Sequence, residues 1–375
     1  VEMASRQQHG FTLIELMVGV VLGMLTVIII SQVLIHSEAS RRNVAMGGDA
    51  EVNGSLSLFS LQRDIQMAGY GLTNLPDAMG CTVKSKFDSE DEQTFTLAPT
   101  LIVNGADGAP DSVTVIQGHT ANSSVPMRVT SDLAGRFKVE SSMGIREGDQ
   151  IVAVPQIWSP TDHSQWCTLY SVTHNSPSAD TSLSNDNVPH SDTGTENGTD
   201  TYKWNATAIA PATGYPAGSL LLNLGSPSIR TYSISDEYSL QTVERAATNG
   251  TTTTQDLYSQ IVNLQALYGK DTNDDGTVDV YNTTIPTTTA EWQQIISVRI
   301  ALVARSNQFI KEKVTTTEPL WNLGAATTVE GETTVDCGSD SKCVTLKLSH
   351  VTDWEHYRYK VYSTTIPLRN VLWNS

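Results

Sequence analysis

The most constraining feature of the sequence is an apolar stretch that begins at residue 11. From Phe11 to Ile35 the chain reads FTLIELMVGVVLGMLTVIIISQVLI, and Glu15 is its only charged side chain. A helix of this length is about 38 Å long at 1.5 Å per residue, which is enough to cross a hydrocarbon core of about 30 Å. The sequence therefore predicts a single membrane-spanning helix over residues 11–35.

The polar residues 1–10 come before the apolar stretch, which is unusual for an ordinary secretory signal. Such a signal has a shorter apolar core, with small residues and the cleavage site after it. Here we expect any cut to precede the apolar stretch. A carboxylate at the membrane centre costs about 2.5–3.5 kcal/mol on insertion scales, so Glu15 requires a positively charged partner such as an α-amino group.

Gly10 followed by Phe11-Thr12-Leu13-Ile14-Glu15 resembles the class III signal of type IV pilins and type II secretion pseudopilins. The resemblance implies cleavage after Gly10 by a prepilin peptidase and N-methylation of Phe11. It also implies that Glu15 pairs with the Phe11 amine of a neighbouring subunit, which sets the stagger between subunits. A plain signal anchor on an unrelated exported protein is the alternative for this segment.

Gly19 and Gly23 are four residues apart on one face of the expected helix. Small residues at this spacing allow membrane helices to approach closely. The same glycines also lower helix propensity by about 1 kcal/mol each, so a local softening of the helix is an equally good interpretation.

Helical spacing continues after the membrane segment, through residues 36–69. One apolar stripe contains Val52, Leu56 and Phe59, and an adjoining stripe contains Leu58, Leu61, Ile65 and Ala68. Gly69-Tyr70-Gly71 is a stop signal. We expect one helix over about 11–69, whose amphipathic half, 36–69, docks on an apolar surface.

Residues 70–375 show the alternating patterns of short strands and predict a β-rich head. The fold class is therefore α+β: a long N-terminal helix packed on a large, mostly antiparallel head, as in type IV pilins. Between residues 174 and 218 the sequence is dominated by Ser, Thr, Asn, Asp, Gly and Pro, and we expect a long exposed polar excursion there.

Several stretches resemble the PilW group of minor pilins. They lie at 60–71 (SLQRDIQMAGYG), 264–269 (LQALYG), 292–306 (from Trp292 through RIALVARS) and 364–370 (TTIPLRN). The resemblance implies a low-copy subunit of the complex that primes pilus assembly, located in or near the pilus tip. The implied partners are other minor pilins, the major pilin, an adhesin-like tip protein, the prepilin peptidase and the inner-membrane assembly platform.

The sequence leaves two other roles open. One is an abundant shaft pilin or a secretion-system pseudopilin with a large head. The other is a binding module that uses the polar excursion to recognise a surface or glycan. In all three cases the precursor is a single-pass inner-membrane protein with its head in the periplasm, and a pilin then moves into the extracellular filament.

Residues 271–279 (DTNDDGTVD) have the spacing of a calcium loop. Asp271, Asn273, Asp275 and Asp279 supply oxygens at positions 1, 3, 5 and 9, Thr277 offers its carbonyl at position 7, and Gly276 permits the tight turn. Position 12 is Asn282 instead of the usual bidentate Glu. The sequence predicts a structural Ca²⁺ site, and a solvated turn of the same composition is the alternative. No other cofactor is expected.

The four cysteines suit disulfides. Cys337 and Cys343 bracket a short polar loop, while Cys81 and Cys167 remain as a possible second pair, and no Cys or His spacing typical of zinc is present. Disulfides imply an oxidising compartment. Four separate buried thiols are the alternative.

The overall charge and the motif content argue against two further classes of function. The formal charge of −17 would repel a phosphate backbone, so direct nucleic-acid binding is not expected. The sequence contains no nucleophile elbow, phosphate-binding loop, paired zinc histidines or dinucleotide fingerprint. We therefore do not expect an enzyme.

Overall fold

A computed structural model describes residues 12–88, 90–120, 125–159, 164–173, 183–191, 195–196, 200–201, 203–205, 209–247, 250–325, 328–338 and 340–372. The chain divides into two compact units, residues 1–49 and residues 50–375. The first unit is helical throughout its described part, from Leu13 onwards, and the second contains the end of the same helix and the whole head.

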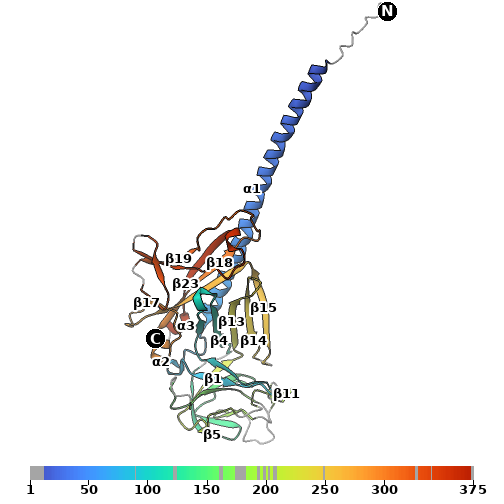
Figure 1. Ribbon diagram of the computed structural model, residues 1–375. Coiled ribbons are helices and arrows are strands. Elements are labelled where there is room, and N and C mark those ends of the chain that lie inside the picture. Colours follow the sequence, from blue (N-terminus) through green and yellow to red (C-terminus); the bar gives the residue numbers. More distant parts are fainter. Residues whose placement is uncertain are drawn as a thin grey trace, which may run out of the picture. The chain divides into compact units, whose positions relative to one another are not determined.

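The N-terminal helix α1 spans Leu13–Met67 (Figure 1), which confirms the expected helix within the described residues. Its end follows from local chemistry. Gly69 and Gly71 adopt positive φ angles of 79° and 83°, which side chains with a Cβ rarely tolerate, and the Gly69 amide donates to the carbonyl of Ile116 instead of to the helix.

The largest sheet of the head has eight strands. All of its neighbouring pairs are antiparallel except β1 and β8, which are parallel over a short register. Its two faces pack on two apolar clusters. The order is β2 (Gln93–Thr96), β1 (Thr82–Ser85), β8 (Cys167–Ser171), β7 (Gln150–Val154), β12 (Leu220–Gly225), β5 (Met127–Leu133), β6 (Arg136–Val139), β9 (Asn187–Pro189).

The helix α1 packs against two five-stranded sheets. The first is antiparallel throughout, and the second is antiparallel except for the pair β17 and β20. The first has the order β15 (Thr252–Ser259), β14 (Ser239–Arg245), β13 (Ser228–Ile234), β4 (Ser112–Gln117), β3 (Thr100–Val103). The second has the order β20 (Thr328–Glu330), β17 (Val280–Asn282), β16 (Ile261–Lys270), β18 (Ile295–Arg305), β23 (Tyr359–Pro367).

Smaller elements complete the head. A three-stranded sheet has the order β19 (Leu320–Ala325), β22 (Ser341–Thr345), β21 (Thr334–Asp336), and β10 (Thr195–Glu196) pairs with β11 (Asp200–Thr201). The short helices are α2 (Thr289–Gln293) and α3 (Arg369–Leu372), and there are 3-10 turns at Pro76–Ala78, Ala106–Gly108 and Trp354–His356. A capping box between Thr288 and Glu291 fixes the start of α2.

The core that holds α1 lies between the two five-stranded sheets. Leu61, Ile65 and Ala68 of the helix are fully buried in a cluster with side chains of β3, β4, β13, β14, β16, β18 and β23. The two sheets are also tied directly, because the hydroxyl of Tyr268 on β16 accepts the amide of Ile102 on β3 at 2.6 Å. The apolar surface that the amphipathic half of the helix requires is therefore a seam between two sheets.

The expectation of an exposed excursion at 174–218 is wrong for much of its described part. Val188, Trp204 and Tyr215 are almost completely buried, and β9 joins the eight-stranded sheet beside β6. The segment is polar on average, but a few large apolar side chains suffice to anchor it because each buries a large area. Residues 174–182, 192–194, 197–199, 202 and 206–208 of the excursion lie outside the described residues.

Candidate assembly site

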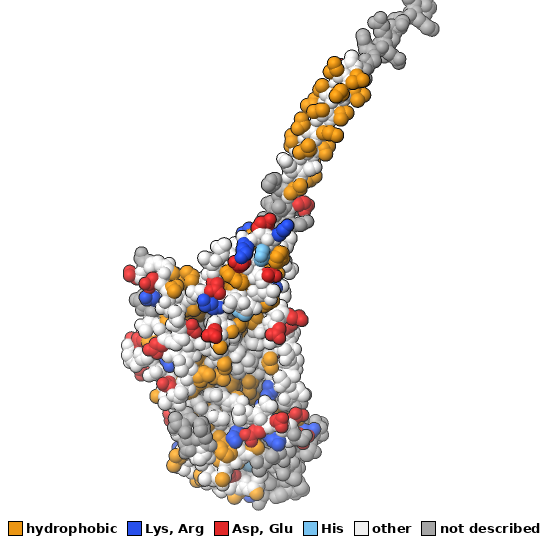
Figure 2. Space-filling model, in the orientation of Figure 1, with side chains coloured by type: hydrophobic (Ala, Val, Ile, Leu, Met, Phe, Trp, Pro, Cys, Tyr) orange, Lys and Arg blue, Asp and Glu red, His pale blue; other side chains and the backbone are white. Residues whose placement is uncertain are grey.

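The membrane segment of α1 runs from Leu13 to Ile35 and is long and apolar enough to cross a bilayer. All its side chains are exposed, and Figure 2 shows a continuous apolar coat along the helix. Gly10 and Phe11, the predicted processing site, lie outside the described residues. The apolar coat is a surface that only lipid or another apolar helix can cover.

Glu15 forms part of a cap at the start of α1. Its carboxylate accepts the amide of Thr12 at 3.0 Å and the hydroxyl of Thr12 at 2.9 Å, while the hydroxyl accepts the amide of Glu15 at 3.3 Å. This reciprocal arrangement is a capping box, which the sequence Thr12-x-x-Glu15 signals. The predicted partner of Glu15, the amine of a neighbouring subunit, would compete with these exposed hydrogen bonds.

Gly19 and Gly23 leave open space on the surface of α1. A Cβ built on either residue meets no other atom within 4 Å. Both interpretations of these glycines, close packing of a neighbouring helix and local softening of α1, remain open. Without a Cβ another helix can approach closely, and the same lack of a side chain lowers helix propensity.

A buried charge cluster locks the second half of α1 onto the head. Asp64 is 5% exposed, and its carboxylate accepts hydrogen bonds from the guanidinium of Arg230 and, at 2.6 Å, from the hydroxyl of Tyr232. Arg230 also donates to Glu244 at 3.0 Å. Burial, followed by the bond to Asp64, raises the pKa of Tyr232 well above its usual value. The hydrogen bonds of this cluster are directional, so they fix the rotation of α1 about its axis relative to β13 and β14. Apolar packing alone would define this rotation less strictly.

The edges of the seam are held by contacts on either flank of the helix. On one flank the amide group of Asn53 donates to the carbonyl of Ser259 on β15 at 3.1 Å. On the other flank Glu51 pairs with Lys360 at 3.2 Å. Gly54 lies directly against the ring of Tyr362, and a Cβ at this position would overlap the ring, so a glycine is required there for close packing.

The stripe of α1 opposite the buried face remains exposed. Val52, Leu56 and Phe59, which the sequence places together on one stripe, are 54%, 43% and 61% exposed, and Met67 continues the same side. Sequence periodicity found both stripes but did not indicate which one docks. The exposed stripe provides an apolar helix face within the head unit that no described part of the chain covers.

The predicted calcium loop lies between β16 and β17. The carboxylate of Asp271 accepts the amides of Asp274 and Gly276, both at 2.7 Å, and Asp274 and Gly276 have positive φ angles. Asp279 accepts the amide of Thr272 at 2.8 Å, and Asp275 accepts the amide of Thr277 at 2.8 Å.

These contacts test how well the loop fits a cation. Within the described residues no three Asp, Glu, His or Cys side chains converge as a metal cluster. The backbone wraps around Asp271 as a calcium loop does, but Asp275 and Asp279 face Thr277 and Thr272. Ligation would require both carboxylates to exchange these exposed hydrogen bonds for the cation.

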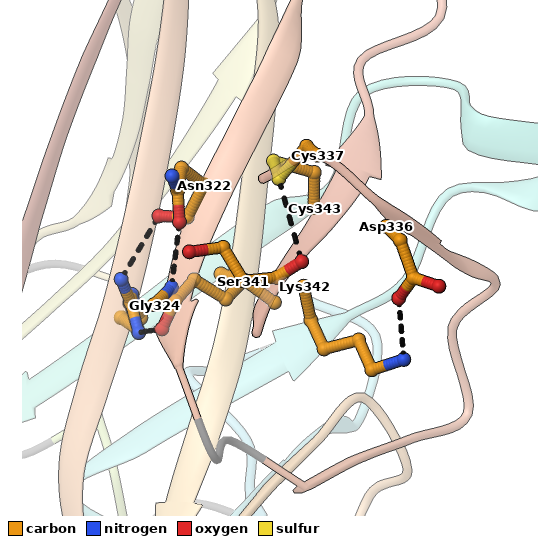
Figure 3. The surroundings of a disulfide bond; sticks show 9 residues. Asn322, Gly324, Asp336, Cys337, Ser341, Lys342 and Cys343 are labelled. Atoms are coloured by element: carbon orange, nitrogen blue, oxygen red, sulfur yellow. Dashed lines mark hydrogen bonds and ion pairs between the residues drawn. A yellow bond between two sulfur atoms is a disulfide. The ribbon is translucent and has the colours of Figure 1, made fainter. Parts of the chain in front are cut away.

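Both predicted disulfides are present. Cys81 and Cys167 are completely buried, with 6.1 Å between their Cα atoms, and their bond links the start of β1 to its parallel neighbour β8. Cys337 and Cys343 close the turn between β21 and β22 (Figure 3), beside an ion pair of Lys342 and Asp336 at 2.6 Å. Close spacing indicated the pair Cys337–Cys343, and the structure shows that the two remaining cysteines form the second pair.

Comparisons with known proteins agree with these features. Residues 5–31 match the model of the prokaryotic N-terminal methylation motif, and residues 229–370 match the model of type IV pilus-assembly protein W, PilW. No curated protein and no solved structure matches the chain. The second match contains Arg230, Tyr232 and Glu244, so it covers the strands that lock α1. On these grounds the chain resembles type IV pilins at its N-terminus, and residues 229–370 of its head are similar to the PilW family.

Proposed function

We propose that this protein is a minor pilin that helps to prime type IV pilus assembly and is located in or near the pilus tip. The observation that carries the proposal is that the two halves of α1 have different surroundings. Its second half is locked into the PilW-matching part of the head through Asp64, whereas residues 13–35 keep a fully exposed apolar surface. Insertion into a helical filament core requires both features: a head that is fixed to the second half of α1, and an apolar segment that other helices can cover.

Maturation follows from the same segment. A prepilin peptidase would cleave after Gly10, and N-methylated Phe11 would become the first residue. Glu15 would then exchange its bonds to Thr12 for the Phe11 amine of a neighbouring subunit. Opposite charges attract strongly where water is excluded, while an unpaired carboxylate there is penalised, so only one stagger of the helices satisfies both groups.

The size of the head favours the tip. The head comprises residues 70–375, and heads of this size would crowd one another along a closely staggered shaft. At the tip no further subunit lies above, so the constraint is relaxed. Other minor pilins, the major pilin and an adhesin-like tip protein are the expected neighbours, and the precursor would meet the prepilin peptidase and the assembly platform at the inner membrane.

Quantitative mass spectrometry of sheared surface filaments tests both the maturation and the role. We expect the chain to begin at methylated Phe11 and to be scarce beside a smaller pilin. An equally mature but dominant chain would make it the shaft subunit. An uncut leader of residues 1–10 in assembled filaments would overturn the pilin function.

We also propose that the loop 271–279 binds Ca²⁺ as a structural ion. The support is the wrapping of the backbone amides around Asp271, with Asn273, Asp275, Asp279 and the carbonyl of Thr277 within the same turn. Bound Ca²⁺ would stabilise the β16–β17 connection, with an affinity of about 10⁻⁴–10⁻³ M, as in extracellular modules.

Calorimetric titration and melting of the detergent-solubilised full chain test this site. We expect heat uptake or release and a rise in melting temperature with Ca²⁺. Asp271→Asn should abolish both, and Asp274→Asn, at a position that is not a ligand in calcium loops, is the matched control. Absence of heat and of any melting shift in the unaltered chain would eliminate the site.

A further inference from the structure

The strand β19 is an apolar edge of the three-stranded sheet. It pairs with β22, and within the part of the chain that the structure describes no strand pairs with its other side. Its sequence, LWNLGA, contains no charged residue and no Pro. Trp321 and Leu323 are buried, whereas Leu320 is 46% exposed. A neutral apolar strand at a sheet edge is a typical site of association between chains.

The other edges of the described sheets differ from β19 in composition or in length. β15 is polar over its exposed residues (TTTQD at 252–256), and β23 carries Lys360 and ends at Pro367, two residues that oppose strand addition. The strands β2, β3, β9, β10, β11, β20 and β21 have four residues or fewer. Among these edges β19 is therefore the one at which two copies of the chain could join by apolar strand pairing.

Arg299 occupies backbone acceptors of this strand. It extends from β18, and its guanidinium donates to the carbonyl of Leu323 at 2.8 Å and to that of Asn322 at 3.1 Å. Successive carbonyls of a regular strand point in opposite directions, so one guanidinium can reach both only where the strand is irregular. The irregularity is a bulge between Asn322 and Gly324 (Figure 3), where Gly324 has a φ of 89° and donates its amide to the side chain of Asn322 at 2.7 Å.

The guanidinium of Arg299 also brings a positive charge to β19. It lies 5.2 Å from the ring centre of Tyr281 and 5.9 Å from that of Trp321, and these cation–π contacts hold it in place. Within the described residues its hydrogen bonds go to neutral carbonyls, so no carboxylate cancels the charge there. If β19 paired with β19 of a second copy, two such charges would lie at the same junction, and like charges close together destabilise strand pairs.

We infer that Arg299 is a self-blocking contact that keeps β19 from pairing with β19 of a second copy. Two neutral apolar strands can pair without the repulsion that a net charge of −17 creates between other parts of the surface, so a second copy is the occupant that this edge would accept. The guanidinium prevents this pairing because it uses two of the carbonyls and places a cation beside them. The inference concerns the free head and does not depend on the proposed role in the filament.

Light scattering coupled to size-exclusion chromatography of the detergent-solubilised full chain tests this contact. Arg299→Met keeps the length of the side chain and removes the donors and the charge, so we expect at least about tenfold more of the chain in dimers and larger species. Arg128→Met is the matched control, because it removes the charge of an arginine that is 57% exposed on a different sheet, and it should leave the size distribution unchanged. The same distribution for both variants would overturn the inference.

A second substitution separates loss of the block from loss of the fold. Leu320→Lys places a charge on β19 at a position that is already exposed, so Arg299→Met/Leu320→Lys should return to the size distribution of the unaltered chain. Thr316→Lys adds the same charge at an exposed position outside any strand and should not reverse the effect of Arg299→Met. Hydrogen exchange at 320–325 should be slower in the oligomers of Arg299→Met than in the monomer. Oligomers that persist with Leu320→Lys, or that protect other segments instead, would show that Arg299 only stabilises the fold.

Discussion

The head contains two regions that treat the N-terminal helix differently. The helix-docking region is formed by α1, the two five-stranded sheets and the three-stranded sheet that packs on β16 and β18, and it buries Leu61, Ile65 and Ala68 of α1. The eight-stranded region packs on two other clusters, to which α1 contributes no described side chain. The PilW match begins at residue 229, after the last strand of the eight-stranded sheet. What this chain shares with the family is therefore mainly the part that holds the helix.

The eight-stranded region is stabilised by a long-range disulfide and by a cluster of buried aromatic side chains. Its disulfide joins residues that are 86 apart in sequence, whereas that of the helix-docking region joins residues only 6 apart. Its aromatic cluster encloses His190, whose ring lies 4.2 Å from Phe137 and 4.5 Å from Tyr170. A region without a helix to pack on obtains its order from long-range links and from large buried rings.

Removal of the two disulfides should give the largest difference between the regions. Loop-closure entropy predicts a loss of about 4–5 kcal/mol for Cys81→Ala/Cys167→Ala and about 2 kcal/mol for Cys337→Ala/Cys343→Ala. Urea unfolding of the two double variants measures both values. Equal losses would show that the regions are not stabilised in these different ways.

A buried carboxylate should make the helix-docking region less stable at neutral pH than in mild acid. Asp111 is 1% exposed and accepts the amides of Gly105 at 2.8 Å and Ala266 at 2.7 Å, and burial raises its pKa from 3.8 to about 7. Because the folded state binds the proton more tightly, the favourable contribution is complete below pH 3.8 and is lost as the pH rises through 7. The shift corresponds to about 4 kcal/mol.

Asp111→Asn is the variant that isolates this contribution. The difference in unfolding free energy between it and the unaltered chain should change steadily between pH 4 and pH 7. A constant difference across that range would show that Asp111 does not titrate as its burial requires.

The buried histidine should give the eight-stranded region the opposite pH response. Burial lowers the pKa of His190 from 6.5 to about 4. Its neutral ring stabilises the fold above pH 6.5, and this contribution is lost as the pH falls through 4, with about 3 kcal/mol at stake. His190→Phe should therefore lose less stability than the unaltered chain between pH 6.5 and pH 4 in denaturant titrations. Parallel acid limbs would contradict the assignment.

Disruption of the charge cluster should loosen α1 from the helix-docking region. Asp64→Ala leaves Arg230 with Glu244 alone and Tyr232 without an acceptor from the helix, and we expect a loss of about 2 kcal/mol. Arg63→Ala removes only the exposed partner of Asp64, which lies 3.5 Å away on a side chain that is 68% exposed, and should cost less than about 0.5 kcal/mol. Chemical denaturation followed by tryptophan fluorescence measures both, and similar losses would remove Asp64 from its role as the lock.

The smallest expected effect concerns two glycines of one helix. Gly54→Ala forces a Cβ into the ring of Tyr362, and the cost of overpacking should exceed the gain in helix propensity by about 1 kcal/mol. Gly48→Ala meets no neighbouring atom and should not lower the melting temperature. If both variants behave alike, Gly54 is a matter of helix propensity only.

Sequence reasoning reached the helix, the short-range disulfide and the β-rich character of the head, but it gave no sign of β15 and misjudged the excursion. The threonine run at 252–254 reads as polar loop, because pairing with β14 and not burial makes it a strand. The average composition of residues 174–218 is polar and gives no sign that Trp204 and Tyr215 are buried. Two large side chains change the average over a long segment very little. Thr12 and Glu15 have the spacing of a capping box, so this cap could be predicted from the sequence.

The membrane segment, the methylation motif, the extent of α1 and the short-range pair Cys337–Cys343 were all indicated by the sequence, because each depends on local composition or on close spacing. Which stripe of α1 docks and which remains free depends instead on long-range contacts. That choice rests on Arg230 and Tyr232 meeting Asp64 across 166 and 168 residues of chain, and on Gly54 accommodating Tyr362. These contacts join residues that are far apart in the sequence and depend on how the sheets pack together. The periodicity of apolar residues along the chain does not predict them.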